Sequence, residues 1–195
     1  MGTFDPVIAE AKLRERIESL ENDTLRCFWK IDDGPGPAFF PAVLYAYATI
    51  DYLSSCWAGW NDSKGNRSKN QTMRMATFLE KYCRYGKREC QIAVSLWRHK
   101  LMHTGEPRVL RNAVTNEVYK WEIDSAGKSH MELVPLSAPG EFGFQVNPLT
   151  LVQDLRAGVL GAGGYLAELR QSPDLQQMFL DFMQETESYN ITLRE

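Results

Sequence analysis

Residues 87–102 carry apolar side chains on nearly every side of the helix that their spacing predicts. A surface helix keeps its apolar residues in one stripe, so a helix of this kind has to be buried by several neighbours. The apolar positions are Ile92, Ala93, Val94, Leu96, Trp97, Leu101 and Met102. The sequence therefore predicts that this segment is packed on several sides, either inside a helical bundle or against a second subunit.

Other helical segments are expected around it. Their apolar residues recur every three to four positions, and capping residues, glycines and prolines mark their ends. The predicted helices start at Asp5-Pro6, Pro41, Met75, Lys87, Asn147-Pro148 and Ser172-Pro173. The first is expected to end near Trp29, the second at Gly59 and the third at Gly86.

After Gly105 the spacing of apolar residues changes from helical to alternating. Tyr119, Trp121 and Ile123 alternate with charged residues, and a second alternating run covers residues 131–133. Alternation with a period of two is typical of strands, and the polar, Gly-containing stretch between the two runs is typical of a turn. We therefore expect a β-hairpin or a small three-stranded appendage.

The fold class predicted from these segments is mainly α, a helical bundle with a small β-hairpin insertion. The length favours a single domain over residues 1–195. The bundle core is expected at about 5–104, the hairpin insertion at about 108–135 and the C-terminal helices at about 147–188. The glycines at 158–164 do not form a dinucleotide-binding pattern, and they predict close helix approach or a kink.

Charge is divided unevenly along the chain. The whole sequence has 22 basic and 25 acidic side chains, for a formal charge of −3. Residues 61–112 hold 12 of the basic and 4 of the acidic side chains, so this segment carries +8 and the remainder −11. The basic segment predicts a track for a polyanion such as RNA, and a solvated charged surface is the simpler alternative.

Neither a metal nor a cofactor is expected. The four cysteines and three histidines include no C-x-x-C pair and complete no zinc-ligand pattern, so we expect reduced, mostly buried thiols. The N-terminus lacks the basic flank and apolar core of a secretory signal. The longest uncharged run, residues 34–50, is broken by three prolines and is too short to span a bilayer. These features predict a cytoplasmic protein without a membrane segment.

The basic segment converges on Arg98-His99-x-x-x-His103, whose residue types suit metal-free phosphodiester cleavage. Arginine offers a planar fork of donors to a phosphate, and imidazole exchanges protons near neutral pH. His103 could therefore take a proton from an attacking hydroxyl and return one to a leaving oxygen. On an ideal α-helix the two side chains diverge by about 140°. They share a site only if the helix unwinds near His103, or if a second copy completes the site across a two-fold axis.

The order of these segments resembles the HEPN superfamily of helical bundles. The matching segments are Ile50-Asp51-x-Leu53, a basic loop, Arg74-Met75-x-x-Phe78, Arg98-His99-x-x-x-His103, Gly105 and a hairpin. The superfamily motif is an arginine, a polar residue and then a histidine after four to six intervening positions. Arg98 and His103 have four residues between them, with His99 as the polar residue, and the resemblance covers roughly residues 40–135.

This resemblance implies a four-helix core that forms a homodimer, often with a metal-independent endoribonuclease activity. In that case Arg98 would hold the scissile phosphate of a single-stranded RNA, His103 would be the general acid and base, and His99 would orient one of them. Asp51, isolated among apolar residues, is expected to hold Arg98 or His103. The residues expected to bind other RNA phosphates are Lys87, Arg88, Lys100, Arg108 and Arg111.

A non-catalytic alternative stays open. Arg98 could pair with Asp51 or Glu89, and His103 could bond the last carbonyls of its helix, where the helix dipole favours a cation. The same cleft would then hold a nucleotide, an RNA, a partner protein or simply the dimer together. The sequence does not predict a cognate partner such as an antitoxin.

Overall fold

The computed structural model describes residues 3–28, 39–59, 71–101, 109–124 and 129–187, apart from the side chains of residues 98–101 and 187. The helices are α1 (Pro6–Phe28), α2 (Phe39–Ala58), α3 (Gln71–Phe78), η1 (Leu79–Cys83), α4 (Lys87–Ala93), η2 (Val94–Leu101), α6 (Pro148–Leu160), α7 (Tyr165–Leu169) and α8 (Pro173–Glu187). The strands are β1 (Leu110–Arg111), β2 (Val118–Ile123), β3 (Glu132–Pro135) and β4 (Glu141–Val146). The predicted mainly α fold with a small β element is confirmed.

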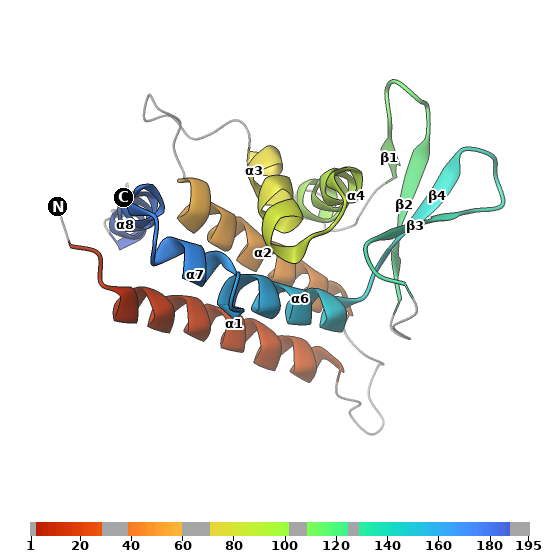
Figure 1. The fold of residues 1–195 in the computed structure, drawn as a ribbon. Coiled ribbons are helices and arrows are strands. Elements are labelled where there is room, and N and C mark those ends of the chain that lie inside the picture. Colours follow the sequence, from red (N-terminus) through yellow and green to blue (C-terminus); the bar gives the residue numbers. More distant parts are fainter. Residues whose placement is uncertain (1–2, 29–38, 60–70, 102–108, 125–128, 188–195) are drawn as a thin grey trace, which may run out of the picture.

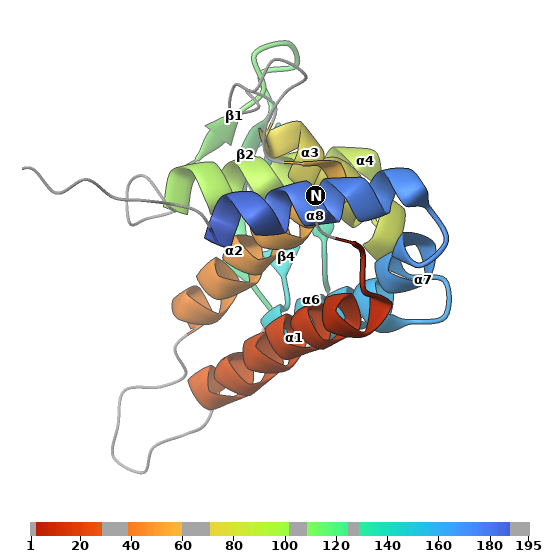
Figure 2. The ribbon, with the colours of Figure 1, turned by 90° about the vertical axis from the view of Figure 1, so that its left-hand side faces the viewer.

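Helix α2 lies at the centre of the bundle. It contacts α1, α3, η2, α6 and α8, and Figures 1 and 2 place α1 on one side of it and α3 with α4 on the other. The core side chains of α1 are Leu13, Ile17 and Leu20, which recur at helical spacing and are fully buried, as are Ile50 and Leu53 of α2. The apolar stripes predicted for these two helices therefore form the core.

The helix starts follow the predicted capping residues. The Asp5 Oδ1 accepts hydrogen bonds from the N–H groups of Val7 at 2.8 Å and Ile8 at 3.3 Å. The Asn147 Oδ1 accepts one from the N–H of Thr150 at 2.9 Å. In each case the side chain satisfies backbone donors that the first helical turn leaves unpaired. The predicted starts of α1 and α6 are therefore confirmed.

Two of the helices change form along their length. α3 continues into the π-helix η1, and α4 continues into the π-helix η2. In a π-helix the hydrogen bonds join residues five apart. Such segments are rare in proteins, but where they occur they are often part of a functional site. Apolar spacing alone did not distinguish these segments from ordinary α-helix.

Gly158 allows α6 to lie close against η1. A Cβ atom at this position would come within 2.7 Å of the carbonyl oxygen of Tyr82, which is too short for any side chain. Gly161 ends α6, and Gly164 precedes α7. The close approach predicted from the glycines is confirmed, and the single helix predicted here is divided into α6 and α7.

The strands form one sheet at one end of the bundle, in the order β1-β2-β4-β3 (Figure 1). β2 and β4 are parallel, with Val118 opposite Glu141 and Ile123 opposite Val146. β1 pairs with β2, and β3 pairs with β4, both antiparallel. The predicted hairpin between the run at 119–123 and the run at 131–133 is wrong, because β4 lies between β2 and β3.

Strand β4 takes a central place for two reasons. Its Phe144 and Val146 are fully buried, so it supplies much of the sheet's contribution to the core. β3 contains Pro135, which has no N–H for a second neighbouring strand and therefore suits an edge. The sequence interpretation did not consider residues 141–146 as a strand, and this omission produced the wrong pairing.

The thiols agree with the expectation of unpaired cysteines. Cys56 and Cys90 are buried, Cys27 and Cys83 are half-buried, and all four are free. Among the described residues, no helix has the length and apolar character needed to cross a bilayer.

Candidate functional site

The helix that carries the predicted motif is buried as its sequence predicts. Its fully buried residues are Cys90, Ala93, Val94, Leu96 and Trp97. They lie within one subunit, so the apolar surface of the described part of this helix is already covered without a second copy. This outcome favours the bundle interpretation over the dimer interpretation for that surface.

An aromatic cluster joins η2 to the sheet. The rings of Trp97 and Tyr47 are stacked with centroids 6.5 Å apart. Trp97 also meets Trp121 of β2 edge-on at 5.8 Å, and Phe40 contacts both tryptophans. Trp97 therefore fixes the helix immediately before Arg98.

Arg98, His99 and Lys100 belong to the backbone of η2, directly after this anchor. Their side chains lie outside the described residues, as do the whole of His103 and Arg108. The meeting of Arg98 with His103, the orienting role of His99 and the phosphate contacts of Lys100 and Arg108 stay predictions. The described feature is the π-helical form of the backbone that carries Arg98.

Asp51 is bound by two residues of α3. Its Oδ1 accepts a hydrogen bond from Arg74 Nη2 at 2.9 Å. The Gln71 side-chain amide donates to both carboxylate oxygens of Asp51, at 2.9 and 2.7 Å. The sequence interpretation considered neither partner, and the contact that it predicted, with Arg98 or His103, involves side chains outside the described part of the chain.

Arg74 fills the space between α2 and α3. Besides Asp51, it donates from Nε to Ser54 Oγ at 3.2 Å and from Nη1 to the carbonyl oxygen of Gly59 at 3.0 Å. Its side chain is only 7% exposed. Arg74 therefore serves as a buried clamp and adds no charge to a surface for RNA.

A pocket of about 190 Å³, here called the basic pocket, opens between α4–η2 and the strands β1 and β2. Arg88 lines it from α4 and Arg111 from β1. Ile92 and Tyr119, both buried, contribute to its wall. The remaining lining residues are Gln91, Ser95, Leu110 and Asn112. The structure thus brings together two of the residues predicted to bind phosphate.

Arg88 is held in place by the residues beside the pocket. Its Nη2 donates to Glu117 Oε2 at 3.0 Å and to the Tyr119 hydroxyl at 3.1 Å. The Tyr119 hydroxyl donates in turn to the same carboxylate oxygen at 2.8 Å. Hydrogen bonds from Thr115 and Tyr119, together with the charge of Arg88, keep the pKa of Glu117 below its ordinary value. The guanidinium is therefore positioned before any ligand arrives.

The other described cations of the basic segment lie outside the basic pocket. Arg84 and Lys87 are exposed, but neither lines the basic pocket. Lys81 pairs with Glu168 of α7 at 2.7 Å. The predicted track for a polyanion also involves residues outside the described ranges, so it stays a prediction.

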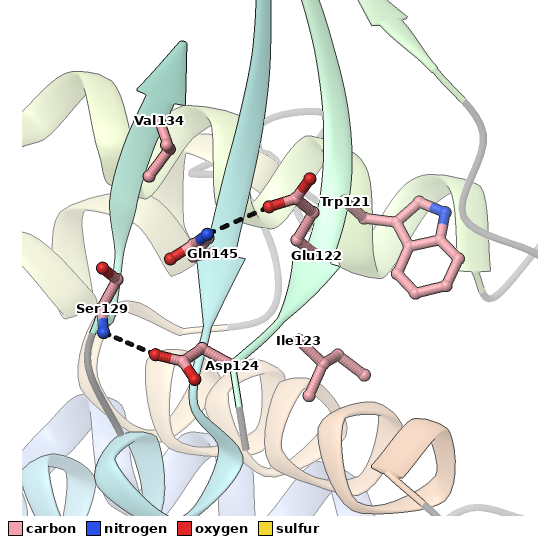
Figure 3. A pocket seen from close by; sticks show the side chains of 7 residues that line it. All are labelled: Trp121, Glu122, Ile123, Asp124, Ser129, Val134 and Gln145. Atoms are coloured by element: carbon pink, nitrogen blue, oxygen red, sulfur yellow. Dashed lines mark hydrogen bonds between the residues drawn. The ribbon is translucent and has the colours of Figure 1, made fainter. Parts of the chain in front are cut away.

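A second pocket, of about 550 Å³, lies against β2, β3 and β4 and is here called the acidic pocket (Figure 3). The Gln145 amide donates to Glu122 Oε2 at 3.1 Å, and the N–H of Ser129 donates to Asp124 Oδ2 at 2.6 Å. The described lining residues include these two carboxylates and no lysine or arginine. Its charge opposes a phosphate, so an anionic ligand prefers the basic pocket.

His130 belongs to a hydrogen-bonded chain that sequence reasoning missed. The N–H of Asn147 donates to His130 Nδ1 at 3.0 Å, so the ring proton lies on Nε2. Nε2 then donates to the Tyr85 hydroxyl at 2.8 Å, and Tyr85 donates to Asp154 Oδ2 at 2.7 Å. Burial lowers the pKa of His130 to about 4, against the opposing effect of the Asp154 charge. Both ring nitrogens are used, so this chain fastens α6 to the sheet and leaves no free base.

The cysteines do not form an alternative nucleophile. Burial raises the pKa of the Cys90 thiol to about 12, and it raises those of Cys56 and Cys83 further. A thiol in this state is a poor nucleophile at neutral pH. Within the described ranges, no group of three His, Cys, Asp or Glu side chains could hold a metal ion.

Comparisons with known proteins give no match, either of the sequence with a family model or a curated protein or of the fold with a solved structure.

Proposed function

We propose that this chain is a HEPN-like, metal-independent ribonuclease that cleaves single-stranded RNA with Arg98 and His103. The observation that carries this proposal is the π-helical form of η2 (Val94–Leu101). On an α-helix, the side chains of residues five apart point about 140° away from each other. In a π-helix, residues five apart are joined by a backbone hydrogen bond and therefore lie one above the other. The backbone that carries Arg98 therefore has the form that favours a common face for residues at the spacing of Arg98 and His103.

Packing supports the same site. Leu96 and Trp97 are fully buried immediately before Arg98, so the backbone at the start of the motif is fixed on the core. A catalytic group has to be held by a rigid element, because small displacements cost much of the rate. The basic pocket also lies along the same helix and provides positive charge for an RNA backbone.

In the proposed reaction His103 takes the proton of an RNA 2′-hydroxyl, and the 2′-oxygen attacks the adjacent phosphorus. The bond between phosphorus and the 5′-oxygen breaks, and that oxygen receives the proton that His103 has taken. The products are a 2′,3′-cyclic phosphate and a free 5′-hydroxyl. Arg98 stabilises the negative charge that develops on the phosphoryl oxygens. DNA lacks the 2′-hydroxyl and should not be cleaved.

A homodimer is part of the proposal, because the family resemblance implies one cleft that faces both subunits. Sedimentation velocity tests this part separately. If the protein is a monomer and cleaves RNA, the homodimer part of the proposal is wrong and the ribonuclease part stands. If the protein is a monomer and does not cleave RNA, both parts of the proposal are wrong.

The ribonuclease itself is tested with purified protein and a single-stranded RNA in EDTA, with DNA of the same sequence beside it. Wild type should cleave only RNA, and Arg98→Ala and His103→Ala should each lose at least about a hundredfold in rate, because an acid or base and a group that stabilises the developing charge each contribute about that much. Arg26→Ala is the matched control, because it removes one exposed charge from the end of α1, on the other side of α2 from α4.

Equal cleavage by wild type and both variants would point to a contaminating nuclease and overturn the proposal. An inactive wild type whose Arg98→Ala variant loses dimerisation or unfolds at lower temperature would favour the non-catalytic dimeric module instead.

A further inference from the structure

The charged residues that line the basic pocket are both arginines, which offer a ligand hydrogen-bond donors only. Arg88 uses Nη2 for Glu117 and Tyr119, and Arg111 makes no ion pair with a described residue. The side-chain oxygen of Asn112 accepts from the N–H groups of the turn that follows it, at 2.9 and 3.2 Å. Its amide nitrogen, which only donates, is therefore the group left for a ligand.

Charge selects the class of that ligand. Two guanidinium groups line the basic pocket, and its described lining includes no carboxylate; Glu117, which pairs with Arg88, lies outside that lining. The pocket therefore carries a net positive charge. Guanidinium forks bind phosphate in two-pronged geometry, so a phosphate oxygen is the best match for these donors.

Size restricts the ligand further. The volume of about 190 Å³ is below the range of about 300 Å³ and more that is usual for sites enclosing whole small molecules. The pocket therefore suits one phosphate group of a longer chain better than a complete nucleotide.

The position of the basic pocket relates it to Arg98. Ser95 lines the pocket, and Arg98 follows three residues later in the same continuous helix. Three residues are less than one turn of a π-helix, whose hydrogen bonds join residues five apart. A chain that places one phosphate in the pocket therefore passes beside the position of Arg98.

We propose that the basic pocket binds a backbone phosphate of single-stranded RNA next to the phosphate that is cleaved. Arg111 and Arg88 each donate to oxygens of this phosphate, and Asn112 adds a neutral donor. The inference rests on the proposed function for its choice of RNA, but the pocket itself reads only a phosphodiester. Arg88 and Arg111 are thus binding residues and take no part in the proton transfers.

The test measures binding of a fluorescent 2′-O-methyl RNA oligonucleotide in EDTA, because this probe has no free 2′-hydroxyl and cannot be cleaved. Fluorescence anisotropy over a salt series gives the affinity and its salt dependence. Arg111→Ala should weaken binding about tenfold, the effect of losing one charged hydrogen bond. It should also lower the salt slope by about 0.7, the value for one phosphate contact on a single strand. Arg88→Lys keeps the charge but loses the fork, and it should weaken binding several-fold.

Arg26→Ala again serves as the control of equal charge, and it should stay within about twofold of wild type. Arg111 has no ion-pair partner among the described residues, so its variant should melt at the wild-type temperature. A DNA strand of the same length should show the same dependence on Arg111, because the pocket does not contact the 2′ position.

No detectable binding of the probe by wild type would overturn the inference. Equal weakening by Arg26→Ala and Arg111→Ala would also overturn it, because the effect would then be one of net charge. If wild type binds the probe through Arg111 but never cleaves RNA, the ribonuclease proposal fails and the pocket stands. If wild type cleaves RNA but the pocket variants bind the probe as tightly as wild type, the inference about the pocket fails and the ribonuclease proposal stands.

Discussion

The Asp51–Arg74 pair and the His130–Tyr85–Asp154 chain both fasten helices to neighbouring elements, but they handle charge differently. Asp51 and Arg74 form an ion pair at 2.9 Å. His130, in contrast, is kept neutral by burial and by the N–H that faces its Nδ1. In the first network the charge of the buried Arg74 is balanced by Asp51, and in the second network burial keeps His130 uncharged. The two should therefore respond differently to loss of a partner and to a change of pH.

Loss of Asp51 or Arg74 alone should have the largest effect. Arg74→Leu removes the Arg74 cation from the Asp51 carboxylate and the Arg74 donors from Ser54 and Gly59. Breaking a buried ion pair on one side costs about 3–5 kcal/mol of unfolding free energy. We expect about 3 kcal/mol, because the Asp51 side chain is 27% exposed. Urea unfolding at pH 7 measures the change.

The matched control is the double variant Asp51→Leu with Arg74→Leu. Replacement of both charges should recover part of the loss, because no uncompensated carboxylate remains. If Arg74→Leu alone loses less than about 1 kcal/mol of unfolding free energy, the Asp51–Arg74 pair does not stabilise the fold to the extent expected.

Among variants compared at pH 7, replacement of His130 should give the second largest effect, and the stability that the His130 chain contributes should depend on pH. The unfolded histidine has a pKa near 6.5, and the folded one has a pKa of about 4. Between these values the unfolded state binds a proton that the folded state does not, so stability falls as the pH falls. The contribution of the neutral His130 to the free energy of unfolding is fully present above pH 6.5, and it decreases toward pH 4 by up to about 1.4 kcal/mol per pH unit. Urea unfolding at several pH values gives this slope.

His130→Asn isolates the contribution of the imidazole, because asparagine cannot titrate and still offers an acceptor to the N–H of Asn147. This variant should be less stable than wild type at pH 7 but should have a flatter pH profile between 4.5 and 6.5. Identical profiles for wild type and variant would show that acidic groups elsewhere cause the loss.

The sequence predicts the helices better than the sheet, for a physical reason. Capping residues and apolar stripes are local signals, so Asp5, Asn147 and the stripe of α1 could be read directly. Strand pairing is not local: β2 pairs in parallel with β4, which begins 18 residues after β2 ends. The alternation of Phe142, Phe144 and Val146 was a usable signal for β4, and Pro135 was a signal that β3 is an edge.

The candidate site shows the same limit. Arg88 and Arg111 were predicted from charge alone, and their meeting in one pocket requires the fold of β1 against α4. Arg74 was missed as the partner of Asp51 because Asp51 was expected to hold Arg98 or His103, although Arg74 lies in the next helix. The His130 chain joins residues up to 69 positions apart, so no local pattern could reveal it.

The exposed pair of Lys81 and Glu168 should give the smallest effect, and it separates charge from burial. Its N–O distance of 2.7 Å is even shorter than that of Asp51 and Arg74, but both side chains are about 40% exposed. Glu168→Gln removes the ion pair and still leaves an acceptor for the Tyr82 hydroxyl. Because water and salt screen exposed charges, the loss should stay below about 1 kcal/mol and should shrink in high salt. A loss as large as that of Arg74→Leu, measured by the same urea unfolding, would show that pairing itself, and not burial, gives the Asp51–Arg74 clamp its energy.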